Sequence, residues 1–333
     1  MRVVLFGSGS PVSVRALEAL VSAAVVVAVV IPGAGPVRGP RTAVRALARR
    51  RATRRLAREA ARRGLPVLRL DPGHEPALLP ELRRLAPDLA CVASFPALLG
   101  ADTLRAPARG TVGVHPSLLP RHRGPDPLFW TYFDDDALAG VTIHWLGEGE
   151  DDGDVILQDS LPLARGRPGP DLYAEVARRG AALLARAVAE IEAGTASRTP
   201  QDASRVTREP APERAGWRID FATWGAEQVW HFLGGVAAAG LAWRDARGRL
   251  VRHGPPRGYR LETPSRAPGS VERVPGGLRL ACRDGFVDLE AARLSRRAWW
   301  TALRLASLGR GPRAATSPRT PAAGGRKGTR SSA

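Results

Sequence analysis

Two kinds of hydrophobic pattern alternate through the first 190 residues. Runs of consecutive apolar residues, typical of strands buried on both faces of a sheet, alternate with stretches whose apolar residues recur at helical spacing. The predicted strands are 2–6, 25–31, 66–70, 89–94, 111–115, 140–145 and 155–163. The predicted helices are 13–22, 42–63, 75–85, 128–133 and 171–194. Such alternation predicts an α/β domain built around a parallel sheet.

The pattern changes after residue 194. Residues 195–215 mix Ser, Thr, Pro and charged residues without periodicity, which is typical of a linker. Short strands separated by Gly/Pro turns follow, and they predict a small β-barrel. These strands are 242–244, 250–252, 259–261, 278–282 and 286–289. We therefore expect a catalytic domain over 1–194, a linker over 195–215, a small β domain over 216–294 and a basic, largely disordered tail over 295–333.

Membrane insertion and disulfide bonding find no support in the sequence. The longest apolar stretch, residues 19–31, is shorter than the roughly 20 residues that span a bilayer. The N-terminus leads directly into a buried strand and has no signal-peptide cleavage site, so the cytoplasm is the expected compartment. Cys91 and Cys282 lie far apart inside apolar runs, and we expect both to be buried thiols.

The net charge of +18 is concentrated in two segments. Residues 41–63 hold ten arginines against one glutamate, and residues 295–333 hold nine basic residues and no acidic one. Two such segments favour a polyanionic partner, because phosphate contacts dominate nucleic-acid affinity. The alternative is a compositional bias, since nearly every basic residue of the chain is arginine. Charge alone does not decide between the two readings.

Candidate chemistry gathers in the run Gly110-Thr-Val-Gly-Val-His-Pro-Ser-Leu-Leu-Pro-Arg-His-Arg-Gly124. In it, His115 ends a buried strand and is followed by a stiff loop between two prolines. Open α/β sheets bind ligands at the carboxyl edge of their strands, and an imidazole there suits proton transfer near neutral pH. Asp151 lies 36 residues later in an acidic, glycine-rich turn and reaches His115 if their strands are neighbours. On residue type alone, a single histidine at a strand end is more often structural than catalytic.

The chain resembles the folate-dependent formyltransferase family. The resemblance rests on His115-Pro-Ser-Leu-Leu-Pro120 with Asp151-Asp-Gly-Asp154 at the family's spacing. It begins at Met1-Arg-Val-Val-Leu-Phe-Gly-Ser8, extends to Trp217-Arg-Ile-Asp-Phe221, and covers roughly residues 1–294. It implies a Rossmann-like formyltransferase domain, an OB-like C-terminal β-barrel and 10-formyltetrahydrofolate as the formyl donor. The full length is most similar to the branch that acts on methionyl-tRNA.

The resemblance also implies the site residues. The family's active site is an Asn, a His and an Asp. His115 matches the histidine and Asp151 the aspartate, but Gly113 stands where the family has asparagine. The missing amide predicts a weaker site for the formyl oxygen, because one such donor contributes about 10²–10³ in rate. The expected folate contacts are Ser117, Leu118, Leu119, Pro120, Ser94, Phe95, Pro96 and Leu146.

In the implied mechanism His115 takes a proton from the attacking amine, Asp151 orients His115, and no metal takes part. Initiator methionyl-tRNA is one expected acceptor, bound through residues 41–63 and the C-terminal domain of a monomer. A small amine, such as an amino sugar or an ornithine-type amine, is the second. A folate- or RNA-binding paralogue with impaired catalysis is the third reading.

Other polar residues favour ordinary roles. His122 is expected to be a solvated loop residue and His144 an ordinary strand residue. The acidic run Asp134-Asp-Asp136 is expected to be a surface turn that ends a helix, and not a metal site.

Overall fold

The computed structural model describes residues 1–33, 40–71, 74–212, 217–237 and 242–291. Within residues 40–49 it describes the backbone of a helix but no side chain. The predicted basic tail, 295–333, lies outside the described residues. No helix in the described part of the chain is long and apolar enough to cross a membrane.

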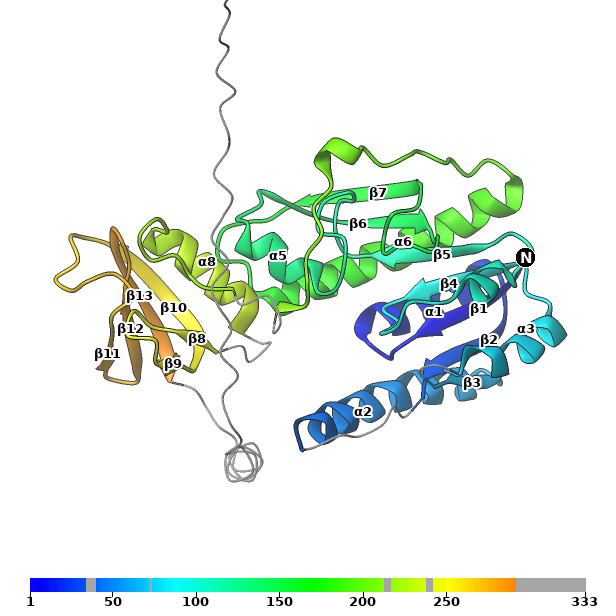
Figure 1. The fold of residues 1–333 in the computed structure, drawn as a ribbon, viewed down its shortest axis with the longest axis horizontal. Helices are drawn as coiled ribbons and strands as arrows, with labels where there is room; N and C mark the ends of the chain where they lie inside the picture. Colours follow the sequence, from blue (N-terminus) through cyan, green and yellow to red (C-terminus); the bar gives the residue numbers. More distant parts are fainter. Residues whose placement is uncertain (34–39, 72–73, 213–216, 238–241, 292–333) are drawn as a thin grey trace, which may run out of the picture. The chain divides into compact units, whose positions relative to one another are not determined.

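Seven strands form the central sheet, in the order β3-β2-β1-β4-β5-β6-β7 (Figure 1). Their bounds are β1 Arg2–Gly7, β2 Val25–Pro32, β3 Val67–Leu70, β4 Leu89–Ala93, β5 Thr111–His115, β6 Leu138–Trp145 and β7 Val155–Pro162. All seven were predicted from the apolar runs, with small shifts at their ends. The order reverses between β1 and β4, which places β4 and β5 beside the switch point where such sheets bind ligands.

The sheet is mixed and not wholly parallel as expected. Strands β1 to β5 run parallel, whereas β6 is antiparallel to both β5 and β7. Only nine residues join β6 to β7, too few for the crossover that a parallel pair needs. The pairing has a consequence for the site, because it sets Gly113 of β5 directly opposite His144 of β6.

Helices cover both faces of the sheet. Side chains of α1, α2 and α6 share one core with alternate residues of the strands, and α3 and α4 share a second core with the others. The helices are α1 Pro11–Ala23, α2 Pro40–Arg62, α3 Leu79–Leu85, α4 Ala101–Arg105, α5 Pro127–Phe133 and α6 Gly169–Ala193. Helix α6 ends at Gly194, which adopts the left-handed conformation (φ 73°) that glycine tolerates best. Cys91 and Cys282 are buried thiols, as predicted.

The C-terminal part differs from the sequence expectation in two ways. Helix α8, Ala226–Val236, stands where short strands were expected, and Phe232 on it packs edge-to-face on Phe129 of α5. The described strands form a four-stranded antiparallel sheet and a separate two-stranded ribbon, not a closed barrel. They are β8 Trp243–Arg244, β9 Leu250–Val251, β10 His253–Leu261, β11 Val271–Val274, β12 Gly277–Ala281 and β13 Gly285–Ala291. The predicted domain boundaries stay predictions.

Candidate active site

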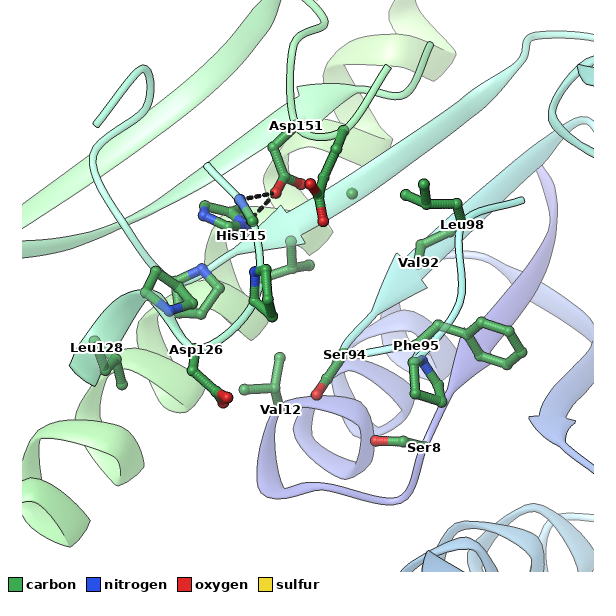
Figure 2. A pocket seen from close by; sticks show the side chains of 18 of the residues that line it. Ser8, Val12, Val92, Ser94, Phe95, Leu98, His115, Asp126, Leu128 and Asp151 are labelled. Atoms are coloured by element: carbon green, nitrogen blue, oxygen red, sulfur yellow. Dashed lines mark hydrogen bonds and ion pairs between the residues drawn. The ribbon is translucent and has the colours of Figure 1, made fainter. Parts of the chain in front are cut away.

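A cavity of about 1050 Å³ opens at the carboxyl ends of β4 and β5. Figure 2 shows His115 and Asp151 facing each other on one side of this cavity, with Ser8, Ser94 and Phe95 on the opposite side. Segments far apart in sequence therefore meet in one space. The location agrees with the general rule for ligand sites in open α/β sheets.

His115 and Asp151 form the pair that the sequence predicted. The Nδ1 atom of His115 lies 3.4 Å from Oδ2 of Asp151, and both side chains are largely buried. Asp151 is held from two sides: its Oδ2 accepts the Gly124 N–H at 2.8 Å, and its carbonyl accepts Nε2–H of Gln201 at 2.8 Å. This rigid support suits a carboxylate that must keep one orientation while protons move.

The hydrogen bonds of His115 assign its tautomer. Its Nε2 lies 2.8 Å from the carbonyl oxygen of His122, and a carbonyl only accepts, so Nε2 carries hydrogen. Any proton that His115 gains or loses is therefore bound at Nδ1, the nitrogen that faces Asp151. The structure thus places the histidine and the aspartate side by side, in an arrangement that suits proton transfer. The charged imidazolium form has an acceptor at each nitrogen.

The space beside Gly113 is occupied by neighbouring side chains. A Cβ at position 113 would lie 2.8 Å from Cδ2 of Leu146 and 3.1 Å from Nε2 of His144. Gly113 is not among the glycines with positive φ, so its backbone angle does not require glycine. A larger residue here would require the Leu146 side chain to rotate and the His144 ring to shift slightly.

His144 is a buried part of the site and not an ordinary strand residue. Its Nδ1–H donates to the Trp145 carbonyl at 3.0 Å, and its Nε2 lies 3.7 Å from Oδ1 of Asp151. Burial, with the nearby charge of His115, lowers the pKa of His144 to about 4. At neutral pH its Nε2 therefore carries a lone pair and accepts hydrogen bonds. In this form it offers no donor in place of the amide that the resemblance led us to expect at position 113.

The predicted folate residues divide into two groups. Ser94, Phe95, Pro96 and Leu146 line the cavity. Ser117, Leu118, Leu119 and Pro120 are absent from the described lining, and the loop they form is tied to the neighbouring strands. In particular, the Ser117 carbonyl accepts Oγ1–H of Thr142, and the Leu119 carbonyl accepts Nε2–H of Gln158, both at 2.7 Å. Folate contact by this second group stays a prediction. Their hydrogen bonds hold the loop that follows His115 against β6 and β7.

Sequence reasoning missed three polar residues of the cavity: Ser8, Asp126 and Tyr173. Asp126 follows the Arg–Gly pair of the loop, and its φ of 57° turns the chain into α5. Burial raises the pKa of the Tyr173 phenol, so the group stays protonated and remains a hydrogen-bond donor. Tyr173 comes from α6, and no spacing in the sequence connects it with His115; only the fold brings the two together.

The Rossmann-like sheet with its cavity at the carboxyl edge defines the class as a doubly wound α/β protein. Residues 1–188 match the family model described as formyl transferase, which covers more than half of the chain. The chain therefore belongs to the formyl transferase family and is an enzyme that transfers formyl groups. This confirms the family that the sequence motif indicated.

Curated relatives agree with this assignment. The methionyl-tRNA formyltransferase of Syntrophus aciditrophicus (strain SB) is 32% identical over 236 residues, which cover 70% of this chain and 74% of that protein. The methionyl-tRNA formyltransferase of Anaeromyxobacter sp. (strain K) is 36% identical over 225 residues, covering 67% of this chain and 72% of the relative.

Solved structures share the fold at low sequence identity. The sugar 3N-formyl transferase WlaRD aligns with a TM-score of 0.61 at 12% identity, covering 87% of this chain and 97% of that one. A variant of HypX from Aquifex aeolicus aligns with a TM-score of 0.58 at 20% identity, covering 87% of this chain and 43% of HypX. At such identities the alignments support the fold alone.

Proposed function

We propose that this enzyme moves a formyl group from 10-formyltetrahydrofolate to the amine of initiator methionyl-tRNA. The observation that carries the proposal is the His115–Asp151 pair, 3.4 Å apart, in a cavity large enough for a folate head and a second reactant. Family membership supports the folate donor. The names of the curated relatives support the acceptor.

The chemistry follows from the geometry of the pair. The neutral amine attacks the formyl carbon, a C–N bond forms, and the carbonyl oxygen becomes an oxyanion. The amine proton passes to the His115–Asp151 unit, with Nδ1 as the protonation site on the imidazole. The same unit returns a proton to N10 of the folate as the bond from N10 to the formyl carbon breaks. With no side-chain amide at Gly113, the positive charge of the His115 imidazolium stabilises the oxyanion.

Helix α2 supplies a surface for a polyanionic acceptor. Its inner face packs on the sheet through Leu56 and Ala60, while Arg50, Arg51, Arg54, Arg55 and Arg58 are exposed. The helix also adjoins the cavity, because the loop that holds Ser8 packs on the α2 backbone at Ala52. An acceptor stem bound along α2 would have its end close to the His115–Asp151 pair.

The C-terminal sheet, β10 to β13, would hold the rest of the tRNA. We propose that it is an OB-like module in which basic residues of β10 face the phosphate backbone. Arg257 and Arg260 are both exposed on that strand. This is the expected contact mode of a domain that binds RNA by backbone and not by base sequence.

The decisive experiment offers the enzyme 10-formyltetrahydrofolate together with methionyl-tRNA, free methionine, an amino sugar and ornithine, and identifies formylated products by mass spectrometry. Formylated methionyl-tRNA alone supports the proposal. A formylated small amine without any tRNA product would reassign the acceptor. Absence of every product, in protein that binds tetrahydrofolate, would support the impaired paralogue.

Salt dependence tests the surface independently of turnover. Replacing Arg54 and Arg55 with Gln should weaken tRNA binding and reduce the slope of log K against log salt by about 1–2. The matched control is Arg186→Gln, which removes an exposed arginine of α6 that already pairs with Glu190. Equal slopes in all three proteins would exclude α2 as the tRNA surface.

A further inference from the structure

His122 is a buried histidine with one unused ring nitrogen. Only 2% of the residue is exposed, so the prediction that His122 is a solvated loop residue was wrong. Its Nε2 lies 2.7 Å from Oδ2 of Asp136. Its Nδ1 is buried and has no hydrogen-bond partner. Buried polar atoms normally form hydrogen bonds, so a buried nitrogen without one needs a physical explanation.

Two carboxylates face this nitrogen. Oδ2 of Asp134 lies 3.9 Å from Nδ1 of His122, which is too long for a hydrogen bond. A carboxylate oxygen of Glu209 completes the group, and the three candidate ligand atoms all lie within 4.8 Å of one another. They come from three segments: the loop after β5, the C-terminal cap of α5 and the segment that follows α6.

The cluster is short of positive charge. Asp134, Asp136 and Glu209 bring three carboxylates together, and Arg121 is the cation placed against them, 3.5 Å from Asp134 and 2.8 Å from Asp136. Three neighbouring carboxylates facing one guanidinium are favoured by a further cation.

We propose that His122, Asp134 and Glu209 bind a divalent transition-metal ion, with Zn²⁺ as the best match. Imidazole nitrogen with two carboxylate oxygens is a zinc donor set, and water would complete a tetrahedron. Bonds of about 2.0–2.1 Å place tetrahedral ligands roughly 3.3–3.4 Å apart, so the side chains would draw together by about 0.5–1.5 Å. Mg²⁺ and Ca²⁺ fit less well, because they prefer oxygen ligands alone.

Asp136 gives this cluster a feature that a chance group of acids lacks. Metal-bound histidines usually donate their other ring N–H to a carboxylate, which fixes the tautomer and the ring orientation. His122 has such a carboxylate partner, because its Nε2 lies 2.7 Å from Oδ2 of Asp136. This contact leaves the lone pair on Nδ1, directed at the two proposed carboxylate ligands.

The ion would hold the loop that positions the catalytic histidine. The carbonyl of His122 accepts Nε2–H of His115, so tying down His122 also orients His115. The metal itself would touch no reacting atom. We therefore assign it a positioning role, distinct from the formyl-transfer chemistry and independent of which amine is the acceptor.

The test is metal binding by the full chain without an affinity tag, after removal of metals with a chelator. Titration with Zn²⁺ in competition with a chromophoric chelator should show one site with a Kd below about 1 µM, and Mg²⁺ should not compete at millimolar concentration. X-ray absorption should show one imidazole and otherwise oxygen ligands near 2.0 Å, with no sulfur. The absence of sulfur separates this site from adventitious binding at Cys91 or Cys282.

Three variants and a matched control complete the test. Asp134→Asn and Glu209→Gln should each weaken Zn²⁺ binding at least tenfold and abolish the rise in melting temperature that Zn²⁺ causes. Arg121→Gln removes the competing cation and should tighten binding. Asp135→Asn is the control, because Asp135 lies in the same turn but pairs with Arg165, and it should bind like wild type.

The melting temperature of each metal-free variant shows whether it is folded. Removing one carboxylate from an acidic cluster should leave that temperature unchanged or higher. Wild-type affinity in both Asp134→Asn and Glu209→Gln would overturn the proposal, as would a wild-type Kd above about 100 µM.

Discussion

Gly113→Asn tests how the active site handles the developing oxyanion. Gly113 lies in the middle of the sheet, paired with Val92 of β4 on one side and His144 of β6 on the other, so its backbone cannot move away. The new Cβ would lie 2.8 Å from Leu146 and 3.1 Å from His144. Leu146 can rotate, but His144 is held by its bond to the Trp145 carbonyl.

The magnitude follows from two opposing terms. Overpacking costs about 1–3 kcal/mol, which at about 2–4 °C per kcal/mol lowers the melting temperature by roughly 2–12 °C. A well-placed amide donor contributes about 2.7–4 kcal/mol to turnover, but only in the correct orientation. We expect the crowded amide to miss that orientation, so Gly113→Asn should lower stability without raising kcat.

Differential scanning calorimetry and steady-state kinetics on four variants and the wild type separate these terms. Gly113→Ala adds the same Cβ without an amide and should show most of the stability loss. Combining Gly113→Asn with Leu146→Ala makes room, and turnover should then exceed that of Leu146→Ala alone. An unchanged melting temperature with at least tenfold faster turnover in Gly113→Asn alone would refute the steric argument.

The remaining predictions concern proton transfer and acid stability. His115→Ala and Asp151→Asn should each reduce kcat by about 10²–10⁴ and leave the folate Kd within roughly tenfold, as measured by single-turnover kinetics and fluorescence titration; near-normal turnover in both would exclude the pair. Nδ1 of His231 accepts the Gly166 N–H at 2.9 Å, and burial with the charge of Arg165 lowers the pKa of His231 to about 4. The unfolded state therefore binds more protons than the native state between about pH 6.5 and pH 4, so stability falls as the pH falls through that window. His231→Gln should flatten the dependence of the urea midpoint on pH in that window, and an unaltered slope would contradict this assignment.

Much of the fold and the central pair could be predicted from the chain itself. Apolar runs located all seven strands of the main sheet, because a strand buried on both faces has a local signature. Helix α8 was missed, and its aromatic side chains pack on residues distant in sequence: Trp230 on Tyr259 and Phe232 on Phe129. Strand direction was missed too, although the short connection between β6 and β7 carried the necessary signal.

The motif in the sequence determined the family and placed His115 and Asp151 in one site, because residue type and spacing are properties of the chain alone. Only the tertiary structure showed which side chains pack against Gly113. The antiparallel register of β5 and β6 sets His144 against it and crowds the position that a Cβ would take. Tertiary structure also brought Asp134 and Glu209 to the unused nitrogen of His122. Burial and electrostatic environment depend on which segments pack together, and that contact pattern is not a local property of any segment.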